Sequence, residues 1–391
     1  MNPNRPNLNR AAKHNVFGVR TRPVSASRGA AGTQPPGAQA APPPVEAQSG
    51  LGADFASLTP DVIIDAVEAA HGQRLAGFAN PLKSYINRVY ELQCVDKTRV
   101  IAKFYRPGRW SLETLHEEHE FVRQCAADDI PVVAPFALSD GSTLGTVEGI
   151  RFAVYPKRLG RQWEPCNDED WRRLGRLIGR VHAVGKRQAA THRVRLSPTD
   201  STDRDVAQLL DGGFISPKHR KAFAEVARDI LDLIRPLFDG VEFCRIHGDC
   251  HSGNILDRPG EGLSIIDFDD MVAGAPVHDL WMLLPDRADQ VQRELDLILE
   301  GYRMFCDFDA RSLVLIEPLR VMRMLYFQAW ISRQVGDAGF AVSFPEWGTE
   351  AFWMREIGGL QRQLDVIRDH LPDPGAVTEV RVTSPEAPPA P

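Results

Sequence analysis

The segment Cys244–Leu256, CRIHGDCHSGNIL, contains two cysteines, two histidines, an aspartate and an asparagine within thirteen positions. Three kinds of functional site use such residues. They are a zinc site built on sulfur and imidazole, a cysteine nucleophile with a histidine base, and a phosphotransfer loop that uses only the aspartate and the asparagine. The choice among them decides both the fold and the chemistry.

The two sulfur-based interpretations meet geometric objections. A structural zinc site needs two separated chelating pairs, but the four candidate ligands fall within eight residues: Cys244, His247, Cys250 and His251. Cys250 and His251 are neighbours in sequence, and neighbouring side chains on a strand or loop usually point apart, so the base would not face the sulfur. A structural alternative stays open, in which the cysteines are small packing residues and the histidine is buried.

The polar residues fit a phosphotransferase loop. His247, Asp249 and Asn254 reproduce the spacing H-x-D-x-x-x-x-N. An aspartate can accept or orient the proton of an acceptor hydroxyl, and an amide oxygen can bind Mg²⁺ without adding charge beside the phosphates. Asp267 follows the apolar run of SIIDFDD, where a carboxylate can bridge a metal ion to a nucleotide. A single aspartate after a strand is most often a turn residue, but Asp249, Asn254 and Asp267 in this order favour a catalytic site. The predicted catalytic residues are Asp249 and Asp267. The predicted metal ligands are Asn254 and Asp267.

A kinase-like site also requires a lysine and an acidic helix residue upstream. Lys103 lies in the alternating stretch IAKFY, on the strand face that also carries Ile101 and Tyr105, and this face is predicted to point toward the catalytic half. In the following helix, Glu118 is the predicted ion-pair partner of Lys103, and Glu117 is the alternative.

The secondary-structure pattern changes from strands to helices along the chain. Thr59 and Pro60 begin a helix that Gly72 ends, residues 86–105 form a predicted hairpin, a helix spans 111–126, and RFAVY is a strand. Farther on, helical spacing dominates at 171–185, 222–238, 290–305, 312–335 and 353–370. This pattern predicts an α+β fold of two lobes, a small antiparallel-sheet N-lobe at 53–155 and a larger, mainly helical C-lobe at 156–372.

Composition limits the class of protein. The 391 residues are 43% apolar and 25% charged, as in an ordinary globular protein, and the net charge of −6 argues against nucleic acid as the main partner. No apolar run approaches the roughly 18 residues that a membrane span needs. The six cysteines show no paired spacing, which favours reduced thiols in the cytoplasm. We expect a cytoplasmic monomer without a membrane or nucleic-acid partner.

The two ends of the chain differ from its middle. Residues 1–52 are rich in proline and alanine, and residues 373–391 end in SPEAPPAP. Both segments offer too little apolar surface to offset the entropy of ordering, so both are predicted to be disordered. Ser25 and Ser27 are candidate autophosphorylation sites in the first of them.

Several motifs together resemble a known family. HGDCHSGNIL, IIDFDD and PVHDLWMLL are similar to the aminoglycoside phosphotransferase and choline kinase superfamily, whose fold resembles that of protein kinases. SYINRVYEL, VIAKFYRPGRWS, EEHEF and FAVYPKRLGRQWE resemble, more closely, the bacterial stress response kinase A family of serine/threonine protein kinases. The resemblance extends from about Leu58 to at least Leu284.

The resemblance implies roles for individual residues. Asp249 would be the catalytic base, Lys103 the ATP lysine, and Asp279 a residue that stabilises the catalytic loop, although it could equally cap a helix. Ser84 would contact the ATP phosphates, and Tyr155 would lie in the hinge where the backbone meets adenine.

The resemblance also implies the reaction, which is transfer of the ATP γ-phosphate to protein serine or threonine with Mg²⁺. Two alternatives stay open. One is a kinase for a small-molecule hydroxyl such as homoserine, choline or an aminoglycoside, and the other is a nucleotide-binding pseudokinase scaffold. Only a short stretch separates Asp267 from Pro276, which leaves little room for an activation loop, so we expect activity without phosphorylation there.

Overall fold

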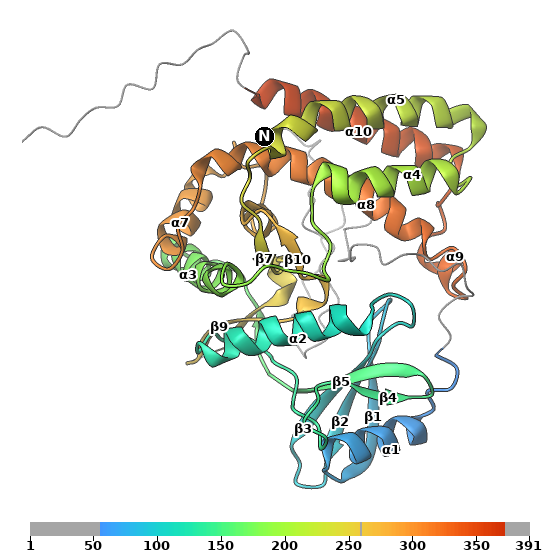
Figure 1. The fold of residues 1–391 in the computed structure, drawn as a ribbon, viewed down its shortest axis with the longest axis vertical. Coiled ribbons are helices and arrows are strands. Elements are labelled where there is room, and N and C mark those ends of the chain that lie inside the picture. The colour runs from blue at the N-terminus through green and yellow to red at the C-terminus, as the bar shows by residue number, and fades with distance from the viewer. Residues whose placement is uncertain (1–54, 259, 372–391) are drawn as a thin grey trace, which may run out of the picture.

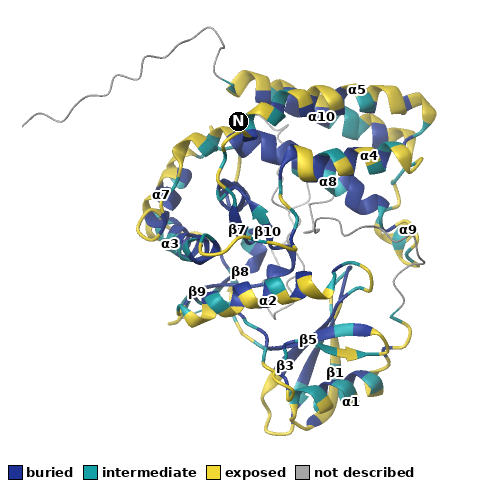
Figure 2. Cartoon of the chain, in the orientation of Figure 1, coloured by how far each residue is buried: buried dark blue, intermediate teal, exposed yellow. Residues whose placement is uncertain are grey.

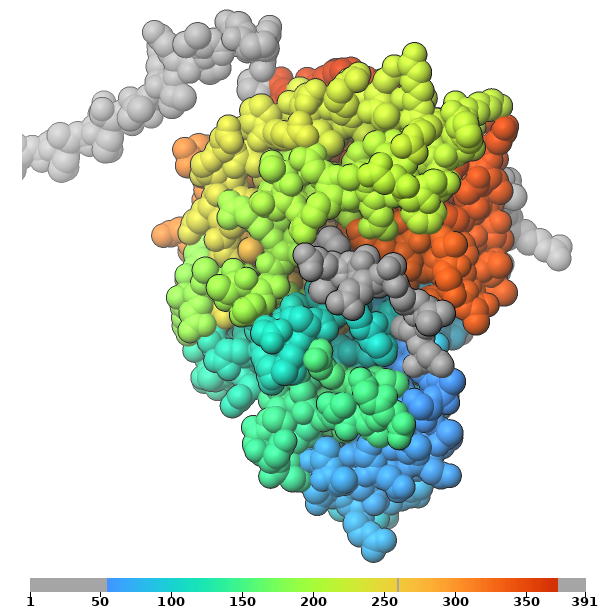
Figure 3. Space-filling model, turned by 45° about the vertical axis from the view of Figure 1, so that its right-hand side comes forward, coloured from blue at the N-terminus to red at the C-terminus, as the bar shows by residue number. Residues whose placement is uncertain are grey.

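The computed structural model describes residues 55–258 and 260–371, so the expected disordered ends, with Ser25 and Ser27, lie outside the described residues. The described chain forms two lobes, one built on a sheet and one mainly helical (Figure 1). The predicted α+β, two-lobe fold is therefore confirmed, while the lobe boundaries at 155 and 156 stay a prediction. The space-filling view shows the two lobes as adjoining masses, the N-lobe below the C-lobe (Figure 3).

The N-lobe contains a five-stranded antiparallel sheet in the order β1-β2-β3-β5-β4. Apolar residues of α1 and of the sheet form one core cluster, whereas α2 lies on the side of the sheet that faces the C-lobe (Figure 1). The elements are β1 (Leu75–Leu82), β2 (Arg88–Cys94), β3 (Arg99–Phe104), β4 (Gly145–Val147), β5 (Ile150–Pro156), α1 (Pro60–His71) and α2 (Leu112–Ala127).

Local chemistry sets the ends of these elements as the sequence predicts. The Thr59 hydroxyl accepts a hydrogen bond from a first-turn N–H of α1 at 3.3 Å, and Gly72 ends the helix in the left-handed conformation at φ 74°. In the β2–β3 hairpin, Lys97 takes φ 72°, and the Asp96 carboxylate accepts from a turn N–H at 2.9 Å. The predicted hairpin and its turn are confirmed.

The C-lobe packs helices around two small sheets. The strands β6, β8 and β9 form one sheet, and β7 pairs with β10 in the other. No helix within the described residues is long and apolar enough to cross a membrane. The elements are α3 (Asp168–Gly185), α4 (Asp203–Asp211), α5 (Pro217–Ile234), α6 (Val277–Trp281), α7 (Gln292–Tyr302), α8 (Ile316–Ser332), α9 (Phe340–Ser343), α10 (Glu350–His370), β6 (Arg161–Gln162), β7 (Cys244–Ile246), β8 (Ile255–Arg258), β9 (Gly262–Ile265) and β10 (Val272–Gly274).

The two small sheets position the segment Cys244–Leu256. Residues 247–254 connect β7 to β8 and are called the catalytic loop after their predicted role. Residues 267–270 follow β9 and are called the metal loop for the same reason. Both loops belong to the part of the C-lobe that is mostly buried, next to α2 (Figure 2). Because the strands end at the junction of the lobes, the polar side chains that follow them meet residues of the N-lobe there.

A second contact joins the lobes at the loop between β1 and β2. The Tyr85 ring lies 5.8 Å from Trp330 at the end of α8 and 5.6 Å from Phe344. Arg106, just after β3, pairs with Asp337. Trp330 is only 2% exposed, so this aromatic cluster buries part of the N-lobe loop against the C-lobe.

Candidate active site

Asp279 on α6 anchors the catalytic loop. Its carboxylate accepts from the backbone N–H of His247 at 2.7 Å, from that of Gly248 at 2.9 Å, and from Nε2 of His182 at 2.9 Å. Burial acts to raise the pKa of Asp279, but the bond from His182 and the surrounding histidines outweigh it and lower the pKa. Of the two roles left open by the sequence, stabilisation of the loop is the one observed.

His247 and Gly248 fix the shape of the loop. His247 Nε2 donates to the Ile266 carbonyl at 2.9 Å, because a carbonyl can only accept, and Nδ1 therefore accepts from the Asp249 N–H at 3.2 Å. Gly248 has φ +81°, and a Cβ there would lie 2.0 Å from the carbonyl oxygen of Asp270. Only glycine fits this position, where the catalytic loop touches the metal loop.

Asp249 lies buried at the centre of the loop with both carboxylate oxygens in use. Oδ1 accepts from Arg323 of α8 at 2.8 Å, and Oδ2 is 3.2 Å from Nε2 of His251. Asn254 donates to the Asp249 carbonyl at 3.1 Å, which orients the amide oxygen of Asn254 for another partner. Burial acts to raise the pKa of Asp249, but His251 and Arg323 outweigh it and lower the pKa to about 2, so the group is ionised at neutral pH.

The cysteines of the segment are packing residues. Cys244 belongs to an apolar cluster with Ile246 and Val272, and Cys250 lies in the main core. Burial raises the pKa of the Cys244 thiol to about 12 and that of Cys250 well above its ordinary value. Protonated thiols are poor metal ligands and nucleophiles, so the structure supports the structural interpretation of the sulfurs.

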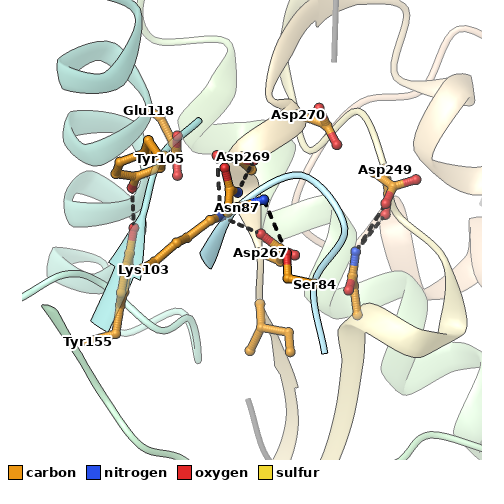
Figure 4. A network of polar contacts seen from close by, with 12 residues as sticks. Ser84, Asn87, Lys103, Tyr105, Glu118, Tyr155, Asp249, Asp267, Asp269 and Asp270 are labelled. Atoms are coloured by element: carbon orange, nitrogen blue, oxygen red, sulfur yellow. Dashed lines mark hydrogen bonds and ion pairs between the residues drawn. The ribbon is translucent and has the colours of Figure 1, made fainter. Parts of the chain in front are cut away.

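Asp267 and Lys103 meet across the interface between the lobes (Figure 4). Lys103 Nζ lies 2.8 Å from Asp267 and 3.2 Å from Asp269. Burial acts to lower the pKa of Lys103, but these two carboxylates outweigh it and raise the pKa well above its ordinary value. The Asp267 side chain is 27% exposed, more than that of Lys103, and its backbone has φ 64°. A non-glycine residue in this conformation is uncommon, and such strain is found at functional sites.

Glu118 does not form the predicted ion pair with Lys103. It pairs instead with the fully buried Arg193 at 2.9 Å, and Arg193 also donates to the Asp269 carbonyl at 2.6 Å. Two nearer carboxylates already hold the lysine, and a buried guanidinium requires an anion of its own. The alternative, Glu117, accepts from the N–H groups of the segment 191–192. Arg193 thus links α2 to the metal loop.

The rest of the metal loop is also held from the N-lobe. Arg109 lies 2.7 Å from Asp269 and 3.0 Å from Asp270, and Asn87 donates to Asp269 at 3.1 Å. Burial raises the pKa of Asp270 to about 8 despite Arg109. The Ser84 hydroxyl accepts from the Asn87 N–H at 3.3 Å, and Asn87 in turn binds Asp269, as the dashed lines in Figure 4 show. The structure therefore brings Ser84, predicted to contact phosphates, to the metal loop.

The Tyr155 side chain lies in the interior behind Lys103. Its hydroxyl is 2.8 Å from that of Tyr105 and 3.3 Å from Nε2 of His119. Tyr155 thus contributes to a buried polar network through its side chain, while the hinge contact of its backbone with adenine stays a prediction. As predicted, Ile101 and Tyr105 face the C-lobe, in an apolar cluster with Leu256 and Ile266.

Three arginines at the site were missed by the sequence analysis. Arg109, Arg193 and Arg323 each bind an aspartate or glutamate far away in the chain. Arg109 lies within the quoted motif VIAKFYRPGRWS, which was the only signal for it. Nothing in local spacing distinguishes the other two from surface arginines.

A pocket opens beside the catalytic loop on the C-lobe side. Its carboxylates are already paired, Asp205 with Arg333 and Asp270 with Arg109. The pocket is lined by Leu196, Ser201, Thr202, Asp205, Gly248, Asp270, Val272, His278, Leu319, Met322, Arg323 and Tyr326. Its lining includes Gly248 of the catalytic loop and Arg323, the arginine that binds Asp249.

Comparison with known proteins agrees with this geometry. Residues 79–313 match the model of the phosphotransferase enzyme family. This chain belongs to that family. The phosphotransferase is 38% identical over 317 residues to stress response kinase A of Escherichia coli strain K12, covering 81% of this chain and 95% of that protein. It is 36% identical over 318 residues to the serine/threonine protein kinase RdoA of Salmonella typhimurium strain LT2, and the match again covers 81% of this chain and 95% of that protein.

Solved structures share the fold of this phosphotransferase. The amicoumacin kinase hAmiN, in complex with AMP-PNP and Ca²⁺, matches with a TM-score of 0.63 and 18% identity over 81% of this chain and 95% of that one. A microcompartment-associated aminopropanol kinase matches with a TM-score of 0.58 and 17% identity, and the match covers 79% of this chain and 98% of that one. The chain is thus a kinase-type phosphotransferase in fold and family.

Proposed function

We propose that this phosphotransferase transfers the γ-phosphoryl group of ATP to serine and threonine hydroxyls of proteins, with Mg²⁺. One observation carries the proposal: Asp249 is buried and ionised, and its carbonyl orients the Asn254 side chain. The ion pair between Lys103 and Asp267 joins the two lobes at the same site. These are the parts that positional and electrostatic catalysis of phosphoryl transfer needs. The name of the Salmonella relative, a serine/threonine protein kinase, supports the choice of acceptor.

Each residue has a role in this proposal. Lys103 would hold the nucleotide phosphates, and Ser84 would cover them from the β1–β2 loop. Asp249 would orient the acceptor hydroxyl and accept its proton.

Asn254 and Asp267 fit a divalent ion. The amide nitrogen of Asn254 donates to the Asp249 carbonyl, which leaves its oxygen as a ligand. Within the described residues, Lys103 contacts Asp267 through Oδ1, which leaves Oδ2 for a metal ion. Oxygen ligands of this kind suit Mg²⁺, which usually completes its shell with phosphates and water. When bound, the ion would neutralise charge that develops on the phosphoryl oxygens.

The pairing of the acidic cluster favours an uncharged or acidic acceptor over a polycation. The acidic cluster would suit a cationic acceptor only if its carboxylates were free. Asp269 and Asp270 are held by Arg109, Asp267 is held by Lys103, and Asp279 by His182 and the loop. An aminoglycoside-like acceptor would therefore find no unpaired anions among these residues.

Two other functions are tested by the same experiment. The amicoumacin and aminopropanol kinases share only the fold with this chain, yet they favour a small-molecule acceptor as the second candidate. A pseudokinase scaffold would bind nucleotide without transfer, and the presence of Asp249, Asn254, Asp267 and Lys103 argues against it.

The experiment incubates purified protein with labelled ATP and Mg²⁺, alone, with a generic basic protein, with casein, and with homoserine, choline and an aminoglycoside. We expect label on protein serine or threonine that disappears in Asp249→Asn and Asp267→Ala. Label found only on small molecules would reject the protein acceptor. Nucleotide binding without any phosphate transfer would favour the pseudokinase scaffold.

We also propose that the protein acts as a monomer in the cytoplasm. The six cysteines are all unpaired thiols, five of them buried, which suits a reducing compartment. Size-exclusion chromatography with light scattering would test the monomer, and cell fractionation the compartment.

A further inference from the structure

Arg323 covers the catalytic carboxylate. Its guanidinium donates to Asp249 Oδ1 at 2.8 Å, while His251 lies 3.2 Å from Oδ2. His251 Nδ1 accepts from the Gly253 N–H at 3.0 Å, so its other ring nitrogen carries the proton that faces Asp249. With both oxygens occupied, the Asp249 side chain is 1% exposed. An acceptor hydroxyl can reach it only after one of these partners leaves.

Arg323 is the partner placed to leave. It lies on α8 and lines the pocket beside the catalytic loop, whereas His251 is tied into that loop by its own hydrogen bond. Among the described residues that line the pocket, Arg323 is the only arginine or lysine. The side chain is 13% exposed and so retains access to the pocket.

Neither carboxylate among the described residues that line the pocket is free to pair with Arg323. Asp205 is paired with Arg333 and Asp270 with Arg109. A guanidinium displaced from Asp249 would therefore be left as an uncompensated charge in a largely buried place, which costs several kcal/mol unless a new anion arrives.

We propose that Arg323 caps Asp249 until the acceptor displaces it, and that the freed guanidinium then binds an anionic oxygen group next to the acceptor hydroxyl. This inference rests on the proposed kinase function and adds a specificity residue to it. Where the acceptor supplies this anion, the site favours hydroxyls with a carboxylate nearby and rejects those with a cation nearby. Guanidinium groups suit carboxylate and phosphate oxygens because they offer parallel N–H donors.

The anionic oxygens have two sources, a carboxylate of the acceptor or the γ-phosphoryl group of ATP. A carboxylate would make the role of Arg323 depend on the acceptor. The phosphoryl group would make it depend on the nucleotide and be the same for every acceptor. Kinetic constants separate the two, because the first changes KM for the acceptor and the second changes kcat and KM for ATP.

The test uses three serine peptides that differ in one neighbour of the serine, which is glutamate, glutamine or arginine. Wild type, Arg323→Gln and Arg323→Lys are compared, with Arg311→Gln, at an exposed C-lobe position, as the control. We expect wild type to prefer the glutamate over the arginine peptide by about tenfold in kcat/KM, since one charge-assisted contact is worth about that factor. Arg323→Gln should abolish the preference, and Arg323→Lys should keep most of it.

The outcomes are distinct. An equal fall in kcat for all three peptides in Arg323→Gln, with a higher KM for ATP, would support the phosphoryl group as the anion. Unchanged preference and constants in Arg323→Gln, with an unchanged melting temperature, would overturn the inference. If wild type phosphorylates no peptide, the protein-kinase proposal fails. The same variants are then compared on glycerate, glycerol and choline, which are negative, neutral and positive, as the three peptide neighbours are.

Discussion

The catalytic loop and the metal loop touch at Gly248, but different parts of the molecule hold them. The catalytic loop takes its partners from the C-lobe, where Asp279 binds its backbone and Arg323 its aspartate. The carboxylates of the metal loop form their ion pairs with the N-lobe, through Lys103 and Arg109, whereas Arg193 of the C-lobe binds only its backbone. The first loop is therefore set when the C-lobe folds, whereas the charges of the second are balanced only when the lobes meet. Damage to each loop should appear in different measurements.

The largest expected effect comes from Asp249→Asn in the catalytic loop. The amide keeps the shape and the contact with Arg323 but cannot take a proton, so kcat should fall by about 10²–10⁴-fold. Nucleotide affinity, measured by calorimetry, should hardly change because the metal loop is untouched. A similar loss of affinity and of kcat would show that the two loops are not separable.

Asp279→Ala should damage the catalytic loop through its anchor. The change leaves two loop N–H groups and His182 without their buried acceptor, and the free energy of unfolding should fall by about 3–5 kcal/mol. Denaturant unfolding measures it. Asp309→Ala, at an exposed position, is the matched control, and an equal effect there would contradict the role of Asp279.

Acid should weaken the catalytic loop before the metal loop. His278 donates to the Gly248 carbonyl, and burial lowers its pKa to about 4 from 6.5. Below pH 6.5 the unfolded chain takes up a proton at this residue and the folded chain does not. Stability from this group is thus complete above pH 6.5 and is lost as the pH falls toward 4, by about 3 kcal/mol. Unfolding curves between pH 7 and 4 measure it, and His278→Gln should flatten the dependence.

The smallest effect should come from Arg109→Lys in the metal loop. A lysine cannot bind Asp269 and Asp270 together, and the loss should be about 1–2 kcal/mol. It should appear as a higher KM for ATP at limiting Mg²⁺, with kcat largely kept. A fall in kcat at saturating ATP and Mg²⁺ would mean that Arg109 supports the catalytic loop as well.

The residues that we propose for the chemistry could be picked out of the sequence because their pattern is local. Asp249 and Asp267 follow the short strands β7 and β9, Asn254 directly precedes β8, and capping residues such as Thr59 act on their own helix. The partner of Lys103 was not predictable, since Asp267 lies 164 positions away and competes with Glu118 for the same cation. Ion pairs between distant segments leave no periodic signal.

Several elements were also missed, and for β1 and α4 the physical reason is clear. β1 is mostly exposed and contains Gly77 and Pro81, so its sequence lacks the alternation of a half-buried strand. α4, of nine residues, is short and begins without a side-chain cap. In addition, the sequence suggested one group of strands around the catalytic segment, while β7 pairs with β10 and leaves β8 and β9 in another sheet.

The aromatic contact between the lobes gives the molecule an optical reporter. Trp330 is buried against Tyr85 of the N-lobe and stacks at 5.7 Å on Phe327. If the lobes separate when nucleotide enters or leaves, water will reach the indole and shift its emission to longer wavelength. The difference between the spectra of wild type and Trp330→Phe would isolate this signal from the other six tryptophans. Stopped-flow fluorescence could then time the opening of the cleft without any attached dye.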